Sequence, residues 1–398
     1  MKKILVSIAV FVILNSTLLI LNSYAQWVQS GINGKDIRSL ILKNNIVLAG
    51  TIDYGVYAST NYGNNWTQTP LNNRTVWKLD TSGNNIFAGT DGLGIQISTN
   101  NGTSWVQSSL NNQSVTSIAV SGNNVFAGTS FNGVFLSTNN GMNWAQTSLN
   151  NKQILSLIIH ENNVFAGTAH EGIYRSTNNG STWFLTSPVS IDAWSFVTSG
   201  INLFAGSYYG GVHLSTNNGM NWVQVGINNM TVYSLTASGN NIFAGTYENG
   251  VFLSNNNGSN WFAKSQGFGT NTTVKALLIT NNSIFAGTDN SVWRRIYSEI
   301  IGIQNVSSET PSAYSLKQNY PNPFNSTSNL KFQIANTRDV KLVVYDITGR
   351  EVQTLVNETL QPGTYEVTFD GSALNSGVYF YKISTGDYSE TKRMTLLK

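Results

Sequence analysis

Five acidic residues occupy short variable segments that follow a recurring Ala-Gly-Thr or Ala-Gly-Ser tripeptide, and they are the residues of this 398-residue chain best placed for chemistry. They are Asp53, Asp91, Glu171, Glu248 and Asp289. Two carboxylates at a suitable separation can serve as the acid and the base of a glycoside hydrolase. The sequence does not give that separation, so glycoside hydrolysis stays one of two hypotheses and no catalytic residue is assigned.

Aromatic residues and one histidine stand in the same segments, or at the position that opens the strand after them. The candidate ligand-binding residues are Tyr54, Trp77, Phe131, His170, Trp194, Tyr208, Tyr209, Tyr233 and Tyr247. The strand-opening position is uneven along the chain, reading Arg38, Trp77, Thr116, Leu155, Trp194, Tyr233 and Lys275. Because loops on a rigid scaffold usually carry specificity, these residues favour non-catalytic binding of a glycan or protein. The alternative is that they are ordinary solvated loop residues.

The motifs of other types of catalytic or cofactor site are not present in the sequence. The three histidines form no HExxH motif, there is no cysteine, and no G-x-S-x-G, P-loop or dinucleotide fingerprint is present. We therefore expect no metal and no cofactor. Without Lys2 and Lys3 of the N-terminal segment, the chain has 20 basic and 19 acidic residues and no basic stripe, which argues against binding nucleic acid.

These residues are positioned by a strict internal repeat. Six copies of Ser-x-Asn-x-Gly-x-x-Trp end in tryptophans that are 39 residues apart, and Trp27 lies another 39 residues upstream. The Ser, Gly and Trp positions of the six boxes are Ser59, Gly63, Trp66, Ser98, Gly102, Trp105, Ser137, Gly141, Trp144, Ser176, Gly180, Trp183, Ser215, Gly219, Trp222, Ser254, Gly258 and Trp261. Each unit reads as four short strands rich in Val, Ile, Phe and Thr, separated by Asn-Gly turns.

This period predicts an all-β fold, a seven-bladed β-propeller over residues 26–297. A β-solenoid is the alternative. The repeat starts in mid-unit at Trp27 and stops after the strand 291–296, so the first strand is expected to complete the last blade. Such closure leaves no long unpaired edge, and we expect a monomer.

The repeated box resembles the Asp-box, or BNR, repeat of sialidase-like, sortilin-like and photosystem assembly-like propellers. The resemblance implies a structural turn between the third and fourth strands, on the face opposite the usual active site. A calcium or sugar site in the box is the alternative, but asparagine replaces the usual aspartate in every copy, which removes a ring of carboxylate ligands. Sialidases need three clustered arginines, and this propeller has only Arg38, Arg74, Arg175, Arg294 and Arg295.

The last hundred residues break the repeat. Residues 298–313 read as a linker, and 314–398 as a small Ig-like β-sandwich with a glycine turn in "DITGRE". "NYPNPFN", "VYDITGREV", "GVYFYKI" and "KRMTLLK", in this order, resemble the type A C-terminal sorting domain of type IX secretion cargo in the Bacteroidota. The resemblance implies recognition by the outer-membrane translocon, followed by cleavage or anchoring. An Ig-like ligand-binding module is the alternative.

The first 25 residues predict a signal peptide, with Lys2 and Lys3 before an apolar run and "SYA" before Gln26. An N-terminal membrane anchor is the alternative. We therefore expect a protein that passes through the periplasm and is secreted or displayed at the cell surface, without disulfides. The sequence does not identify the ligand.

Overall fold

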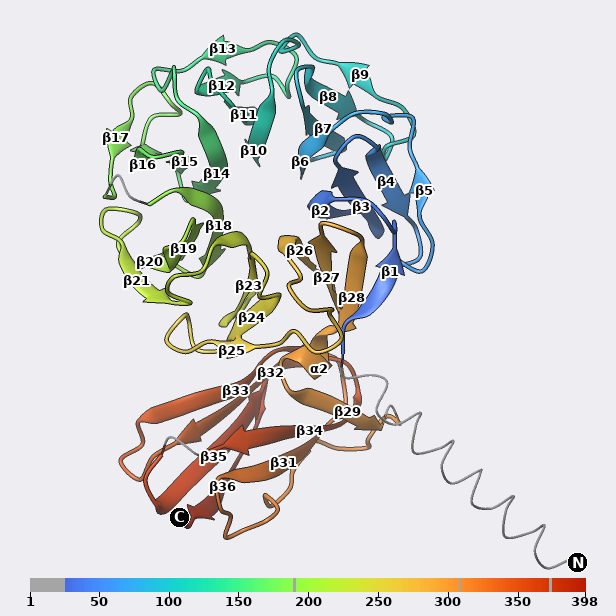
Figure 1. Ribbon diagram of the computed structural model, residues 1–398. Helices are drawn as coiled ribbons and strands as arrows, with labels where there is room; N and C mark the ends of the chain where they lie inside the picture. Colours follow the sequence, from blue (N-terminus) through green and yellow to red (C-terminus); the bar gives the residue numbers. More distant parts are fainter. Residues whose placement is uncertain (1–25, 189–190, 308, 372–373) are drawn as a thin grey trace, which may run out of the picture.

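A ring of β-sheets with a β-sandwich beside it makes up the protein (Figure 1). The computed structural model describes residues 26–398 except 189–190, 308 and 372–373, and the predicted signal peptide lies outside the described residues. Within the described part of the chain, seven four-stranded antiparallel sheets form the ring and two form the sandwich. The all-β propeller predicted from the 39-residue period is confirmed.

Each blade runs outward from a long inner strand to a short outer one. The first three blades are β2 (Ile37–Lys43), β3 (Ile46–Thr51), β4 (Gly55–Ser59), β5 (Thr67–Gln68); β6 (Val76–Ser82), β7 (Asn85–Thr90), β8 (Gly94–Ser98), β9 (Val106–Gln107); and β10 (Val115–Ser121), β11 (Asn124–Thr129), β12 (Val134–Ser137), β13 (Ala145–Gln146). The next three are β14 (Ile154–His160), β15 (Asn163–Thr168), β16 (Gly172–Ser176), β17 (Phe184–Leu185); β18 (Ala193–Ser199), β19 (Asn202–Ser207), β20 (Gly211–Ser215), β21 (Val223–Gly226); and β22 (Val232–Ser238), β23 (Asn241–Thr246), β24 (Val251–Ser254), β25 (Phe262–Ala263).

Blade 7 joins the two ends of the propeller. It contains β26 (Val274–Ile279), β27 (Ser283–Thr288), β28 (Val292–Ile296) and, outermost, β1 (Val28–Gly31). Val28 pairs with Arg294 and Gln29 with Trp293. Buried Trp27 donates a hydrogen bond from Nε1 to the Lys264 carbonyl at 2.7 Å. The closure expected from the position of Trp27 is confirmed.

Glycine of the Ala-Gly-Thr tripeptide sets the spacing between blades. A Cβ on Gly50 would lie 2.9 Å from Val76 Cγ1, the first inner-strand residue of the next blade. The same contact closes the ring, because a Cβ on Gly287 would lie 2.6 Å from Ile37 Cγ2. A larger residue would push neighbouring sheets apart, which explains why this tripeptide repeats.

The C-terminal sandwich begins earlier than the sequence predicted. The predicted linker, residues 298–313, contains most of the helix α2 (Tyr297–Ile300) and the strand β29 (Ile303–Ser307), which pairs with β34 (Gly363–Asp370). The linker prediction was wrong for this part because Ile300, Ile301 and Ile303 are buried. The remaining strands are β30 (Ser315–Leu316), β31 (Thr327–Ile334), β32 (Arg338–Tyr345), β33 (Glu351–Leu360), β35 (Gly377–Thr385) and β36 (Tyr388–Leu396).

One hydrophobic core runs from blades 6 and 7 through α2 into the sandwich. The sandwich sheets are β29-β34-β31-β30 and β33-β32-β35-β36, and alternate residues of their strands, such as Phe332 and Tyr381, face this core. Asn241 of blade 6 donates to the Tyr297 hydroxyl at 3.4 Å. Among the described residues, no helix combines the length and the hydrophobicity needed to cross a bilayer.

Candidate functional site

The six boxes are turns whose polar atoms are satisfied within the turn. In each copy the serine Oγ accepts a hydrogen bond from the glycine N–H at 2.8–2.9 Å. The asparagine Oδ1 accepts from the serine hydroxyl and from the backbone N–H two residues after the glycine, as at Asn139 with Ser137 and Asn143. These contacts agree with a structural role, because the side chains that could bind a ligand already bind the turn.

Box glycines also hold adjacent blades together. Their φ angles lie between +74° and +85°, which favours glycine. A Cβ on Gly219 would lie 2.1 Å from Phe165 Cε1 of the preceding blade, and one on Gly63 would lie 2.7 Å from Phe285 Cε1 of blade 7. The space beside these glycines is therefore occupied by the neighbouring blade.

At the opposite ends of the blades, a β-bulge aims one side chain of every inner strand into a central pocket. The pairing of inner and second strands skips a residue in all seven blades, as between Val76 and Lys78. The skipped residues are Arg38, Trp77, Thr116, Leu155, Trp194, Tyr233 and Lys275, and all seven line a cavity of about 300 Å³ together with Ser130 and Gln153. Bulges commonly redirect side chains near binding sites. The residues that vary at the strand-opening position of the sequence therefore line one continuous pocket surface.

Two cations and three aromatic rings line this pocket. Blades 7 and 1 contribute Lys275 and Arg38, while blades 5 and 6 contribute Trp194 and Tyr233, whose rings meet edge to face at 5.4 Å. Blade 2 contributes Trp77, whose ring centroid lies 5.1 Å from the Arg38 guanidinium. The pocket can therefore offer both a charged contact and an apolar ring face to one ligand.

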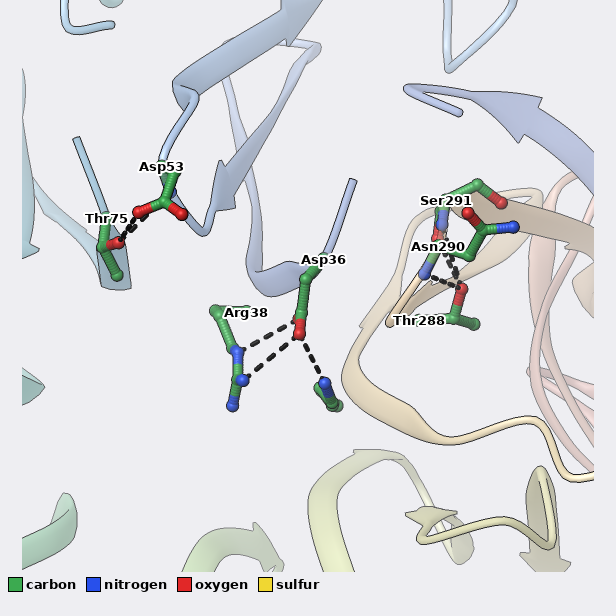
Figure 2. Close-up of polar contacts among 8 residues, drawn as sticks. Asp36, Arg38, Asp53, Thr75, Thr288, Asn290 and Ser291 are labelled. Atoms are coloured by element: carbon green, nitrogen blue, oxygen red, sulfur yellow. Dashed lines mark hydrogen bonds and ion pairs between the residues drawn. The ribbon is translucent and has the colours of Figure 1, made fainter. Parts of the chain in front are cut away.

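Asp36 holds the two cations in place and was not among the predicted site residues. Its Oδ2 accepts from Lys275 Nζ at 2.6 Å and from Arg38 Nη2 at 3.2 Å, and its Oδ1 lies 3.1 Å from Arg38 Nε. Figure 2 shows the Asp36 carboxylate facing Arg38. Because one carboxylate serves two cations, this group keeps a net positive charge.

A shorter loop in blade 7 leaves Asp36 free for this pairing. In five other blade junctions, the residue just before the inner strand accepts a loop N–H of the preceding blade; Thr75 does so from Asp53 at 3.1 Å. The blade 7 loop, residues 289–291, is instead held by its own Thr288, whose Oγ1 accepts from Ser291 N–H at 3.1 Å (Figure 2). This difference was visible in the sequence as a shortened segment.

The five predicted carboxylates do not come together in this pocket. None of them is among the described residues that line it. Asp53 Oδ1 accepts from Thr75 Oγ1 at 3.0 Å, and Figure 2 shows its carboxylate turned toward Thr75. Asp91 accepts from Ser114 Oγ at 2.7 Å, and Glu171 pairs with Lys152. Glu248 and Asp289 are exposed on separate loops.

The predicted aromatic residues divide into two groups. Trp77, Trp194 and Tyr233 line the pocket, and Tyr247 meets Tyr233 at its rim at 6.3 Å. Burial, the largest cause, raises the pKa of Tyr233, so its hydroxyl stays protonated at neutral pH. The remaining candidates lie farther out on the loops: Tyr208 and Tyr209 pack on each other, Tyr54 lies under Lys35, Phe131 is 77% exposed, and His170 Nδ1 lies 3.0 Å from Asp192.

Beneath the pocket, a smaller cavity of about 130 Å³ is lined in part by serines of five inner strands. Ser39, Ser117, Ser156, Ser195 and Ser234 share one position, where blade 2 has Lys78 and blade 7 has Ala276. The Ser156 hydroxyl donates to the Ala193 carbonyl of the next blade at 2.6 Å, so the serines also join blades. Within the described residues, no three His, Cys, Asp or Glu side chains gather as metal ligands would.

In the C-terminal sandwich, the "NYPNPFN" segment is tied to the final strand. Buried Phe324 donates its N–H to the Thr395 carbonyl at 2.9 Å, and the Asn319 N–H donates to the Tyr381 hydroxyl at 2.8 Å. In "DITGRE", Asp346 accepts from Thr348, which is the largest cause of the lowered pKa of its carboxyl. Tyr320 is 81% exposed, so this motif combines buried anchors with an accessible ring.

Residues 318–396 match the family model of the secretion system C-terminal sorting domain. The chain carries a C-terminal sorting domain. It is a substrate of the type IX secretion system, which delivers it to the cell surface or the extracellular space. The sorting domain predicted from the four C-terminal motifs is confirmed.

Solved structures similar to the chain are propellers. YCF48 bound to D1 peptide is 13% identical, with a TM-score of 0.57 over 68% of this chain and 96% of that one. YCF48 from Cyanidioschyzon merolae is 12% identical, with a TM-score of 0.56 over 69% and 99%. An ancestral GH74 enzyme is 17% identical, with a TM-score of 0.55 over 92% of this chain and 63% of its own. These likenesses show the fold alone, and no curated protein matches the sequence.

Proposed function

We propose that the propeller is a non-catalytic binding module that takes a glycan or protein ligand in its central pocket, at the cell surface or after release. The observation that carries this proposal is the pocket itself, in which seven β-bulge residues of different chemistry converge while their surroundings repeat. Loop and rim positions that vary on a fixed scaffold are typical of binding surfaces.

The placement of the carboxylates supports binding over glycoside hydrolysis. A hydrolase of this kind needs two carboxyl groups on either side of one bond. Asp53, Asp91 and Glu171 are instead paired with Thr75, Ser114 and Lys152, which precede inner strands, and Asp36 is paired with two cations. The Asp36 carboxylate is occupied by Lys275 and Arg38, so it is not positioned to act on a substrate.

The full mature chain should be screened on glycan and peptide arrays, with release of reducing sugar measured in parallel. We expect a ligand that is retained without turnover and whose affinity falls at least tenfold in Trp194→Ala, because this ring forms a pocket wall. Phe131→Ala is the matched control, since Phe131 is 77% exposed and outside the pocket. Turnover abolished by Asp53→Ala or Glu171→Ala would overturn the proposal.

For the tail, we propose that residues 314–398 themselves contact the outer-membrane translocon. The exposed ring of Tyr320, in a motif that is otherwise anchored, supports this, because a partner can contact it without unfolding the sandwich. Tyr320→Ala should leave the sandwich folded and reduce surface delivery several-fold, as measured by surface labelling of intact cells. Unchanged delivery of both Tyr320→Ala and a chain lacking residues 314–398 would contradict this proposal.

A further inference from the structure

The central pocket combines three features that together restrict its ligand. Two cations lie on adjacent blades, and aromatic rings lie on blades 2, 5 and 6. The cavity volume of about 300 Å³ limits the bound part of a ligand to a group of about one ring. Each side chain comes from the same bulge position of its blade, so the scaffold presents all of them at one level. A ligand that fills the pocket therefore contacts the charged side and the aromatic side at once.

The charged side has an excess of positive charge. Arg38 and Lys275 share the single carboxylate of Asp36. None of the described residues that line the pocket is an aspartate or glutamate. An anionic group that enters the pocket therefore meets cations whose charge is only partly compensated.

Geometry favours a carboxylate over a larger anion. Arg38 is fixed by Asp36 on one edge and by the Trp77 ring on its face, which leaves part of its donor fork for a ligand beside Lys275. Side-chain exposures of 26% for Arg38 and 16% for Lys275 show that both cations remain partly accessible beside Asp36. Charge-assisted hydrogen bonds to a carboxylate are strong in such a half-buried setting.

The aromatic side fits the apolar face of a sugar ring. Trp194 and Tyr233 meet edge to face, which fixes both rings before a ligand arrives. Tyr233 is on blade 6, beside Lys275 of blade 7, and Trp194 is on blade 5. A pyranose that stacks on this wall would direct a carboxyl substituent at its edge toward Arg38 and Lys275.

We propose that the pocket binds the terminal sugar of an acidic glycan end-on, with a uronic acid carboxylate at Arg38 and Lys275 and the sugar ring against Trp194 and Tyr233. This inference rests on the proposed binding function and names its ligand class. A peptide with a free terminal carboxylate is the competing occupant, and the experiment includes it.

The full mature chain should be titrated by calorimetry with trigalacturonate, its methyl ester and an acidic peptide with a free C-terminus. We expect trigalacturonate, or another uronate trimer of a small panel, to bind at least tenfold more tightly than its uncharged ester. Its affinity should fall when sodium chloride is raised from about 50 to 500 mM, because the contact is ionic. Binding of the peptide should be weaker than that of the uronate.

Matched variants test the residues. Lys275→Met should weaken the uronate at least tenfold and leave the ester unchanged, while Lys275→Arg should retain most of the affinity. Lys341→Met on the sorting domain removes the same charge from an exposed site and should have no effect. Thermal melts of each variant show whether a loss of binding comes from unfolding.

The outcomes separate the two proposals. Equal affinity for acid and ester, preference for the peptide, or no binding of any uronate at millimolar concentration overturns the acidic-glycan inference. The binding function itself survives those results if another ligand is held in a manner that depends on Trp194, and it fails if the chain turns its ligand over. An unchanged uronate affinity in Lys275→Met overturns the assigned contact.

Discussion

The two ends of each blade differ in what their side chains do. At the box end, Ser137, Asn139 and Gly141 bind their own turn, and the same contacts recur in the other five boxes. At the pocket end, the bulge residue of each inner strand has no repeated contact and differs in charge, size and polarity. The comparison teaches that this sequence repeats where side chains serve the scaffold and varies where they face a ligand.

A box glycine should be the most sensitive position of the scaffold. Gly219→Ala places a Cβ against Phe165 at a φ of +74°, so we expect a loss of about 4 kcal/mol in the free energy of unfolding. Gly200→Ala is the matched control, with a φ of +59° and open space around the new Cβ, and should cost about 1 kcal/mol. Equal losses of stability in the two variants, measured by urea titration, would show that Gly219 is needed only for its backbone angle and not for the close approach of Phe165.

Asp80, in the inner strand of blade 2, should make stability depend on pH. Burial raises the pKa of its carboxyl to about 6, against the opposing effect of Lys78, so the folded state disfavours the charged form. Stability from this group is complete below about pH 4 and is lost as the pH rises through 6. We expect Asp80→Asn to stabilise the protein by about 2 kcal/mol at pH 7.5.

The same variant should change little at pH 3.5, where the wild-type carboxyl is protonated in the folded state and mostly protonated in the unfolded state. The equivalent residue in blade 4 is Ile158, so an uncharged side chain is compatible with this position. Thermal melts between pH 3.5 and 8 measure the difference. Equal stabilities of the two proteins across that range would contradict the prediction.

A single box hydroxyl should matter more than a hydroxyl at the pocket end. Ser137→Ala leaves the buried Gly141 N–H without its acceptor, and we expect a loss of about 1.5 kcal/mol. Thr75→Ala removes a comparable contact to Asp53 at an exposed loop and should cost less than about 0.5 kcal/mol. Urea titrations of both variants compare the two ends directly, and the reverse order would break the comparison.

The smallest effect is expected at the exposed carboxylates. Asp53→Ala should change the free energy of unfolding by less than about 0.5 kcal/mol, because the side chain is exposed and bonded only within its loop junction. Ligand affinity should also stay within twofold, since Asp53 does not line the pocket. A tenfold loss of affinity would show that Asp53 takes part in ligand binding.

Much of the fold could be predicted because the 39-residue period identifies the positions that must repeat, such as the box glycines and Trp27. The same comparison of units found Trp77, Trp194 and Tyr233 as variable positions, and the structure brings them to one pocket. It could not find Asp36, because its partner Lys275 lies 239 positions away in the chain. It also missed β29, whose partner β34 lies far along the chain.

Closure of blade 7 has a consequence for folding kinetics. The strand β1 and its partner β28 are more than 250 residues apart in the chain, so their pairing closes a very long loop. Closing so long a loop costs conformational entropy before the contacts between the two strands can form. We therefore expect this pairing to be the last and slowest step of ring assembly. Until it forms, β28 presents an unpaired edge to other chains, and that interval is when the protein is most exposed to aggregation.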